Sequence, residues 1–274
     1  MATQFARTST SVGLSCLCGT WLFGGLAAFS AHATAENDPS CENGESEMAT
    51  DRPDVTNSSQ VVQRSSVQIE NGLNWTSGQQ GTVIDGSNTR VRVGVAACTE
   101  VLIDLPNYVH PVHGSVGSGF SDFSPAIKRQ LPTLPGNIEV STTAGLDFPT
   151  GATQIAGAGY GGYLQLPWSK RIDDGVSVSG MFTTFFLPGR SAHNPTFEST
   201  LAVERQLGSA ADVFIEYVVD QPRRAASTQI IDSGAAYRLT ATRQIDIRVG
   251  FGLDRTAPRL LFGLGYSVRF DGVM

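Results

Sequence analysis

The 274-residue sequence has little charge, few cysteines and hardly any helical periodicity. Charged residues make up 16% of the chain, and the formal net charge is -6 at pH 7. Nucleic-acid binding needs a basic face, so this balance argues against a nucleic-acid partner. Four cysteines are too few for a disulfide scaffold. Beyond the N-terminus no stretch sustains the i, i+3, i+4, i+7 apolar spacing of an amphipathic helix, which disfavours a helical protein.

Long apolar runs are missing everywhere except at the N-terminus. Arg7 precedes an uncharged apolar stretch from Val12 to Phe29, and Ala33-Thr34-Ala35 follows it. This order predicts a signal peptide, residues 1–35, cleaved after Ala35. The alternative is a retained transmembrane helix, because an apolar run of this length just spans a bilayer. No second such run follows, so we expect an exported chain without a membrane helix.

Cleavage there leaves two cysteines, Cys41 and Cys98, in an oxidising compartment. A disulfide between them is chemically possible. Nothing in their spacing brings them together, so the alternative of a small apolar residue at Cys98 stays open.

What the chain has instead is glycine and two-residue alternation. Thirty glycines are about 11% of the residues, against an average of ~7%. The last such stretch alternates Leu260, Phe262, Leu264, Tyr266, Val268 and Phe270 with small or polar residues. Alternation of this kind predicts a strand with one apolar face. We count twelve such stretches from Val67 onward, each of roughly 9–12 residues, the length at which a tilted strand crosses a bilayer.

The connections between these stretches alternate in length. The longer gaps are 77–88, 107–119, 149–159, 188–194, 220–228 and 253–259, and the shorter ones are 96–98, 132–136, 168–174, 208–210 and 240–242. Bacterial membrane barrels combine long outer loops with short periplasmic turns. A soluble β-sandwich gives no reason for this asymmetry.

The two faces of the strands have opposite chemistry, and alternation alone does not say which one points inward. In a sandwich the apolar face forms the core, whereas in a membrane barrel it contacts lipid and the polar face lines the lumen. Export, strand length, strand number and loop asymmetry favour an all-β fold, a single antiparallel outer-membrane barrel of about twelve strands. The lumen-lining candidates are then Glu70, Arg90, Arg92, Glu100, Asp104, Lys128, Arg238, Asp246 and Arg248. Aromatic residues near strand ends fit interfacial girdles; they are Trp75, Tyr108, Phe148, Trp168, Phe186, Phe197, Phe251 and Phe270.

Between the signal peptide and the predicted barrel (65–270) lies a polar arm, residues 36–64, without a core of its own. Asp51, Arg52 and Asp54 give this arm charges that could pair with a charged lumen. The arm is therefore either a plug folded into the barrel or a periplasmic tether.

The stretch HPVHGS holds the candidates for catalysis, His110, His113 and Ser115. A nucleophile needs a base and an orienting group within reach, and this stretch falls in a predicted outer loop. The two histidines also lack a cysteine or carboxylate at a convincing metal-ligand spacing. We therefore predict no enzyme, no cofactor and no metal site.

The C-terminal strand resembles the assembly signal of bacterial outer-membrane proteins. That signal alternates apolar residues and ends on an aromatic one, as residues 260–270 do here, although four residues follow Phe270. The resemblance implies recognition by the barrel-assembly machinery and insertion into outer-membrane lipid.

Several motifs resemble an outer-membrane transporter family named after the meta pathway of phenol degradation. The most specific is TDRPDVT at 50–56, followed by VQIENG at 67–72, SDFS at 121–124, FPTG at 148–151 and IRVGFGL at 247–253. The likeness covers about residues 50–270 and implies an outer-membrane channel or transporter for a small solute. The alternatives are a structural or adhesive barrel with a closed lumen, and a lipid-modifying enzyme.

Overall fold

The computed structural model describes residues 48–79, 81–114, 117–186, 195–223 and 225–273. The predicted signal peptide and Cys41 lie outside these ranges, and so does the open question of whether Cys41 pairs with Cys98. Residues 48–66 contain no helix or strand, and the first strand begins at Val67.

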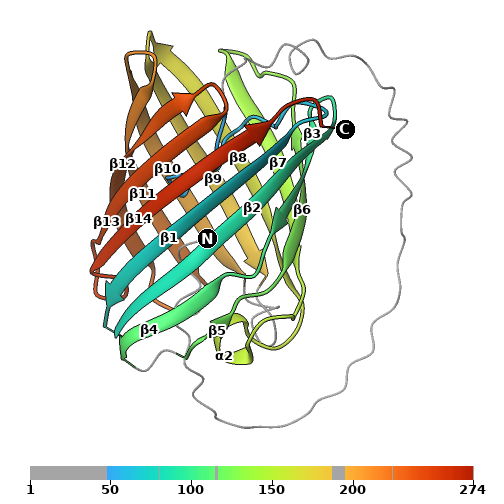
Figure 1. Cartoon of the computed structure of the whole chain (residues 1–274). Coiled ribbons are helices and arrows are strands. Elements are labelled where there is room, and N and C mark those ends of the chain that lie inside the picture. Colours follow the sequence, from blue (N-terminus) through green and yellow to red (C-terminus); the bar gives the residue numbers. More distant parts are fainter. Residues whose placement is uncertain (1–47, 80, 115–116, 187–194, 224, 274) are drawn as a thin grey trace, which may run out of the picture.

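The described chain forms one closed antiparallel β-barrel (Figure 1). The first strand, β1, pairs with β2 on one side and with the last strand, β14, on the other, so the sheet has no free edge along this seam. β3 and β4 are two halves of one barrel strand, and so are β5 and β6, which confirms the prediction of about twelve. The strands are β1 (Val67–Gly78), β2 (Gly81–Ala96), β3 (Thr99–Asp104), β4 (Tyr108–Gly114), β5 (Gly119–Phe120), β6 (Ser124–Gln130), β7 (Ile138–Asp147), β8 (Gly161–Asp173), β9 (Val176–Phe186), β10 (Thr196–Leu207), β11 (Ala211–Pro222), β12 (Thr228–Thr240), β13 (Arg243–Gly252) and β14 (Leu260–Phe270).

One helical turn, α2 (Thr153–Ala156), lies in the connection between β7 and β8. No helix within the described residues is long and apolar enough to cross a membrane.

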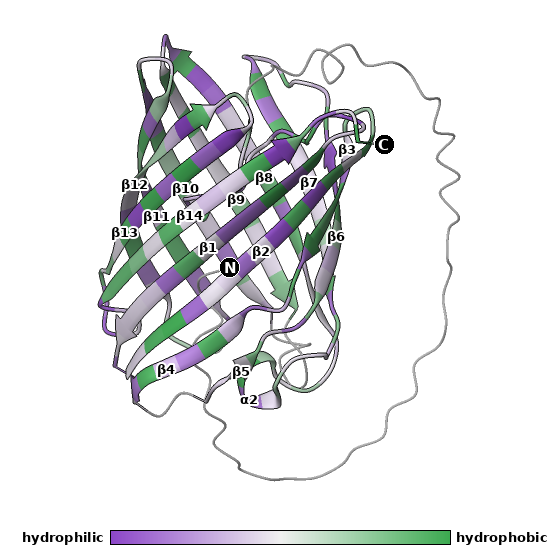
Figure 2. Cartoon of the chain, viewed as in Figure 1, coloured by the Kyte–Doolittle hydropathy of each residue, from purple (hydrophilic) through white to green (hydrophobic). Residues whose placement is uncertain are grey.

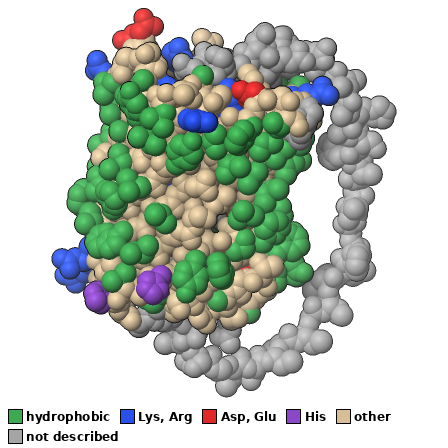
Figure 3. Space-filling view, in the orientation of Figure 1, with side chains coloured by type: hydrophobic (Ala, Val, Ile, Leu, Met, Phe, Trp, Pro, Cys, Tyr) green, Lys and Arg blue, Asp and Glu red, His purple; other side chains and the backbone are tan. Residues whose placement is uncertain are grey.

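The barrel is inverted relative to a soluble protein. Alternate residues of β14 show this: Phe262 and Leu264 are exposed, whereas Ser267 and Arg269 are buried. Hydropathy alternates along the strands (Figure 2). Apolar side chains cover much of the wall seen in Figure 3, where the Lys, Arg, Asp and Glu side chains gather toward the ends. A closed sheet also pairs the backbone groups of its strands with each other, as a hydrocarbon environment demands.

The two ends of the barrel differ in their connections. One end, called the turn end, carries the short links 97–98, 131–137, 174–175, 208–210 and 241–242. The other, called the loop end, carries the β1–β2 hairpin turn, α2 and the loop 253–259. Two expected loops are wrong. Residues 77–88 belong mostly to a β1–β2 hairpin in which Gly78 pairs with Gly81. Most of 107–119, which holds the HPVHGS stretch, is strand, because β4 pairs there with β2. The expected loop 188–194 lies outside the described residues.

A β-bulge in β2 explains why that hairpin was missed. The cross-strand register of β1 and β2 shifts between Glu70 and Gly72. Val83 and Asp85 are buried before the shift, and Arg92 is buried after it, so the inward-facing positions change from odd to even numbers. Asn88, within the bulge, has a φ of 45°, a conformation that asparagine tolerates better than most residues. A single alternating pattern cannot run through such a site.

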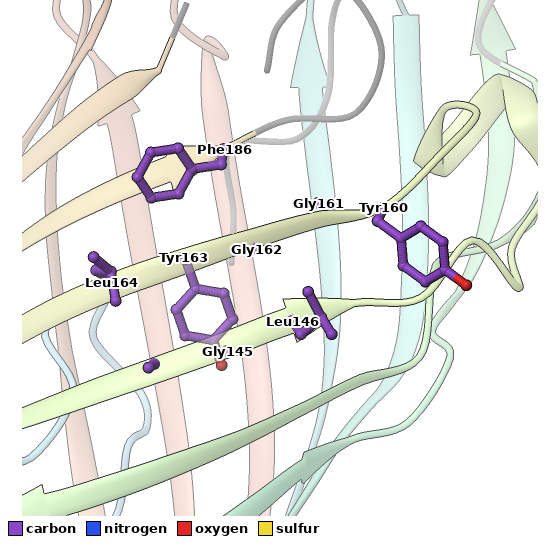
Figure 4. A pocket seen from close by; sticks show the side chains of 9 residues that line it. Gly145, Leu146, Tyr160, Gly161, Gly162, Tyr163, Leu164 and Phe186 are labelled. Carbon is purple, nitrogen blue, oxygen red and sulfur yellow. The ribbon is translucent and has the colours of Figure 1, made fainter. Parts of the chain in front are cut away.

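A depression of about 350 Å³ marks the outer wall where β7, β8 and β9 meet (Figure 4). Gly145 and Gly162 contribute no side chains there, and the Tyr163 ring lies across Gly145. Leu146 and Leu164 on its rim are exposed and apolar. The depression therefore belongs to the apolar outer surface.

Five of the eight predicted girdle aromatics are exposed at strand ends. They are Tyr108, Phe186, Phe197, Phe251 and Phe270, whereas Trp75, Phe148 and Trp168 are half-buried.

Candidate functional site in the barrel lumen

Residues 48–66, called the lumen segment, contact inward-facing side chains of many strands. The segment starts near β1 and β2, reaches Glu216 on β11 in the middle of its course, and returns to Glu100 on β3. Met48, Val55 and Val62 are buried along it. The segment therefore forms a loop within the barrel, with an outgoing and a returning limb.

Asp51 stands at the centre of an ionic network. Its carboxylate lies 3.0 Å from Arg90, 3.4 Å from Arg92 and 3.3 Å from Lys128. Its backbone N–H donates to the Glu70 carboxylate. One carboxylate of the lumen segment thus contacts three cations of the barrel wall, which it shares with Glu70, Glu100 and Asp104.

Arg92 joins the two limbs of the lumen segment. Its guanidinium donates to the Ala49 carbonyl of the outgoing limb at 2.9 Å and to the Gln60 carbonyl of the returning limb at 3.0 Å. It also forms ion pairs with Glu70 at 3.1 Å and Glu100 at 2.9 Å. The side chain is fully buried, and a buried guanidinium is tolerated because carboxylates and carbonyls take up its N–H groups.

Arg52 occupies a space left by two glycines. Gly72 and Gly265 face each other across β1 and β14, and a Cβ on either would come within 2.5 Å of the Arg52 guanidinium. Arg52 also pairs with Asp246 at 3.2 Å. The glycine pair is therefore the place where the outgoing limb approaches the wall most closely.

Glu216 holds the turning point of the lumen segment. Its carboxylate accepts the backbone N–H groups of Val55 and Thr56, both at 2.8 Å. The Thr56 hydroxyl contacts both Glu216 and the Thr200 hydroxyl. Asp232 lies opposite Glu216 on the neighbouring β12. It pairs at 3.7 Å with Arg248 of β13, which donates to the Pro53 carbonyl.

The returning limb is held by uncharged hydrogen bonds and by two glutamates. Asn57 donates to Gln165, and the hydroxyls of Ser59 and Ser169 lie 2.7 Å apart. Two further contacts reach glutamates, from Gln60 to Glu139 at 3.2 Å and from the Val62 N–H to Glu100 at 2.7 Å.

The two aspartates of the lumen segment have opposite electrostatic surroundings. Burial acts to raise the pKa of Asp51, but Arg92, Lys128 and Arg90 outweigh it and hold that pKa well below the ordinary value. Burial, together with Glu216, Glu204 and Asp232, raises the pKa of Asp54 well above its ordinary value. Asp51 is therefore stabilised as a carboxylate, whereas the surroundings of Asp54 favour its protonated form.

Carboxylates outnumber cations among the buried residues. Eleven Asp and Glu residues of the described chain are buried, against four Arg and Lys. A lumen with this balance attracts cations.

A small cavity lies at the loop end of the lumen, beside the Arg90–Asp104 pair. Asp85 of β2 lines it, buried at 5% exposure. Three asparagine side chains donate to one oxygen of that carboxylate, from Asn74, Asn88 and Asn107. Sequence reasoning missed Asp85, since the bulge hid the strand that carries it.

The structure brings six of the nine lumen candidates together around Asp51: Glu70, Arg90, Arg92, Glu100, Asp104 and Lys128. Asp246 and Arg248 lie in the second group, with Arg52 and Pro53. Arg238 stands apart, paired with Asp212 at 2.6 Å beside the turn 208–210. Any role of these residues in transport stays a prediction. Glu216 was not among the predicted candidates, because sequence patterns do not show what a distant segment will contact.

The histidines of the HPVHGS stretch are exposed on β4, and Ser115 lies outside the described residues. Among the residues that the structure describes, no cluster of three or more His, Cys, Asp or Glu side chains is arranged to hold a metal ion.

A family model described as "Putative MetA-pathway of phenol degradation" matches residues 50–270. Among solved structures, an outer membrane channel from Pseudomonas putida F1 is similar, with a TM-score of 0.54 and 13% identity over 75% of this chain and 95% of that one. The KdgM porin, solved in complex with disordered oligogalacturonate, has a TM-score of 0.52 and 10% identity over 75% of this chain and 99% of the porin. At these identities the likeness concerns the fold. No curated protein matches the sequence.

Proposed function

This chain belongs to the family described by that MetA-pathway model, and we propose that it is an outer-membrane channel for a small solute, with the lumen segment as its plug. The observation that carries this proposal is the inverted barrel. Apolar side chains face outward, while buried ionic groups face a closed interior. A wall of this kind is stable in hydrocarbon and separates two aqueous sides.

The plug role rests on the contacts of residues 48–66. The lumen segment meets wall side chains from β1 around to β13, and Asp51, Arg52, Val55 and Thr56 each take part. Most of these contacts are ionic or use backbone N–H groups, so water and salt can replace them when the segment leaves. We therefore place the closed state in this structure and an open state in a withdrawn segment.

The bacterial outer membrane is the proposed location, with the loop end outside and the turn end in the periplasm. The difference between the two ends supports this orientation. The seam supports recognition of 260–270 by the assembly machinery, because β14 is the strand that closes the barrel against β1. The proposed function includes no catalytic step and no cofactor.

An engineered disulfide between the lumen segment and the barrel wall tests the channel and the plug together. The Thr56 hydroxyl of the lumen segment contacts the Thr200 hydroxyl of β10 on the wall, so the double variant Thr56→Cys/Thr200→Cys is placed to form a disulfide. In planar lipid bilayers we expect discrete conductance steps from the wild type. Oxidation of the double variant should suppress them, and reduction should restore them.

Each single-cysteine variant serves as a control and should respond to neither treatment. Bilayers that stay silent with the wild type and with the reduced double variant would remove the channel proposal. Equal conductance of the oxidised and reduced forms, with the cross-link verified by mass, would remove the plug and leave the channel.

A further inference from the structure

We propose that the cavity at Asp85 is a binding site for a small organic cation, such as a short primary alkylammonium ion. This inference deepens the proposed function by naming a class of solute. It rests on that function for the route through the membrane, whereas binding itself can be measured without conduction.

The first step in the argument is the one-sided saturation of the Asp85 carboxylate. Its Oδ1 accepts Nδ2–H donors from Asn74 at 3.1 Å, Asn88 at 2.7 Å and Asn107 at 2.8 Å. Its Oδ2 accepts no hydrogen bond from any described residue. Three amides from three parts of the chain thus fix the carboxylate and leave one oxygen for a ligand in the cavity that it lines.

The second step is the missing countercharge. Within the described residues no Arg, Lys or His nitrogen lies within ion-pair distance of Asp85, although the side chain is buried at 5% exposure. Amide donors spread the charge but do not cancel it. A buried carboxylate without a cationic partner is costly, and a bound cation removes that cost.

The other charged groups of the cavity already have partners. Asp104 receives two N–H groups from Arg90, at 2.7 and 2.9 Å. Arg248 pairs with Asp232 at 3.7 Å. One negative charge therefore remains uncompensated, which fits a monovalent cation.

The apolar part of the lining favours a ligand with an apolar body. Leu105, Val109, Ile155 and Leu261 contribute to it. The enclosed volume is about 60 Å³, several times the ~10–15 Å³ that one water requires on this measure. An ammonium group carrying one to three carbons fits a space with this size and polarity.

The bulge in β2 brings these groups to one place. Asp85 faces inward before the register shift, opposite Asn74 on β1. Asn88, inside the bulge, donates back to Asp85 three residues away, and its backbone N–H donates to Asn107. A regular strand would place Asp85 and Arg90 on opposite faces, so the cavity depends on the irregularity.

The test is a calorimetric titration in which ethylammonium chloride is added to the full mature chain in detergent. We expect saturable binding by the wild type and a loss of at least about tenfold in affinity for Asp85→Asn, since one charge-assisted hydrogen bond disappears. Ethanol and acetate, matched in size, should bind weakly or not at all. Asp173→Asn, on the exposed turn end of β8, is the matched control and should bind like the wild type.

A second variant covers the case in which Asp85→Asn fails to fold. Ile155→Trp enlarges a half-buried side chain of α2 that lines the cavity, leaves the Asp85 carboxylate in place and should also abolish binding. Equal affinities for ethanol and ethylammonium, or unchanged binding by both variants, would overturn the site. Bilayer recordings separate the two proposals: conduction without ethylammonium binding removes only the cation site, and binding without conduction removes only the channel.

Discussion

Arg92 is the residue on which the ionic network of the lumen depends most. It meets three carboxylates and the carbonyls of both limbs while fully buried. Replacing it by methionine keeps much of the volume but leaves Glu70 and Glu100 buried with less compensation. We predict that Arg92→Met lowers the free energy of unfolding by about 3–5 kcal/mol, measured by denaturant titration in lipid vesicles.

The matched control is Arg129→Met on β6, which β3 separates from β2. Arg129 is exposed and donates to Thr99 on the outer surface, so its loss should change the free energy of unfolding by no more than about 0.5 kcal/mol. Equal effects at the two positions would contradict the role of the network.

Asp54 gives the plug a pH dependence with a definite sign. Burial and the carboxylates Glu216, Glu204 and Asp232 raise the pKa of Asp54 well above 3.8. Arg248 of β13 is a nearby cation, and it pairs with Asp232. A carboxyl with a raised pKa stabilises the docked segment while protonated, and this stabilisation is lost as the pH rises through the raised value. We predict that channel opening in bilayers increases with pH over that window.

The Asp54→Asn variant should show a flatter pH profile, because its side chain does not ionise. Asp51, with its lowered pKa, contributes docking stability that is present above its ordinary value and lost only in strong acid, so it opposes this trend only there. Opening that falls with rising pH in the wild type would refute the assignment.

At the scale of single residues, the sequence predicted which charged side chains share a face of the sheet, but not which of them contact one another. Arg92 and Glu100 follow from alternation, because neighbouring strands place them on one side. Their convergence on Asp51 does not follow, since it depends on the path of an irregular segment. Asp85 was missed because the bulge changes which positions of β2 face inward.

At the scale of single strands, the outward face of β14 reports on the lipid contact. Leu264 lies in the middle of the strand with 48% of its surface exposed. We predict that Leu264→Arg lowers the free energy of unfolding in vesicles by about 2–4 kcal/mol, the cost of arginine near the bilayer midplane. Leu134→Arg, in the link 131–137 at the turn end, should cost about 0–1 kcal/mol. Equal costs at the two positions would mean that the wall does not face hydrocarbon.

The glycine pair of β1 and β14 gives a second test at this scale. A methyl group at Gly265 would collide with Arg52 and Asp246, so Gly265→Ala should displace the outgoing limb and raise the open probability in bilayers. Gly78→Ala is the control, because its Cβ meets Pro258 at an ordinary 3.5 Å. Unchanged gating in Gly265→Ala would separate Arg52 from the closed state.

Strands were the most predictable elements, and their connections were the least. Period-two alternation located β9 to β14 closely, because both faces of those strands are regular. The β1–β2 hairpin was taken for a loop because polar and glycine residues at 77–88 interrupt the pattern. Turn composition alone does not distinguish a loop from an extended polar strand.

For the whole molecule, the balance of buried charge predicts cation selectivity. Buried carboxylates exceed buried cations by eleven to four in the described chain. Under a KCl gradient we expect a reversal potential that favours potassium over chloride, with a smaller ratio for Asp147→Asn. A preference for chloride would show that the buried charges do not line the conducting route.

The inverted architecture was predictable at this scale because export, strand length and loop asymmetry all pointed the same way. None of these signals decides between a plugged and an open lumen. That difference depends on tertiary contacts of a polar arm whose own composition favours no structure.

The Arg92 guanidinium holds Ala49 and Gln60 with a single side chain, so the two limbs of the lumen segment pass the same point near the turn end. A loop inserted from one side can slide out and back without any chain end having to thread through the wall. Opening then needs no unfolding of the barrel. A modest pull from the periplasm would start it by breaking the hydrogen bonds of the Arg92 guanidinium to the two limbs.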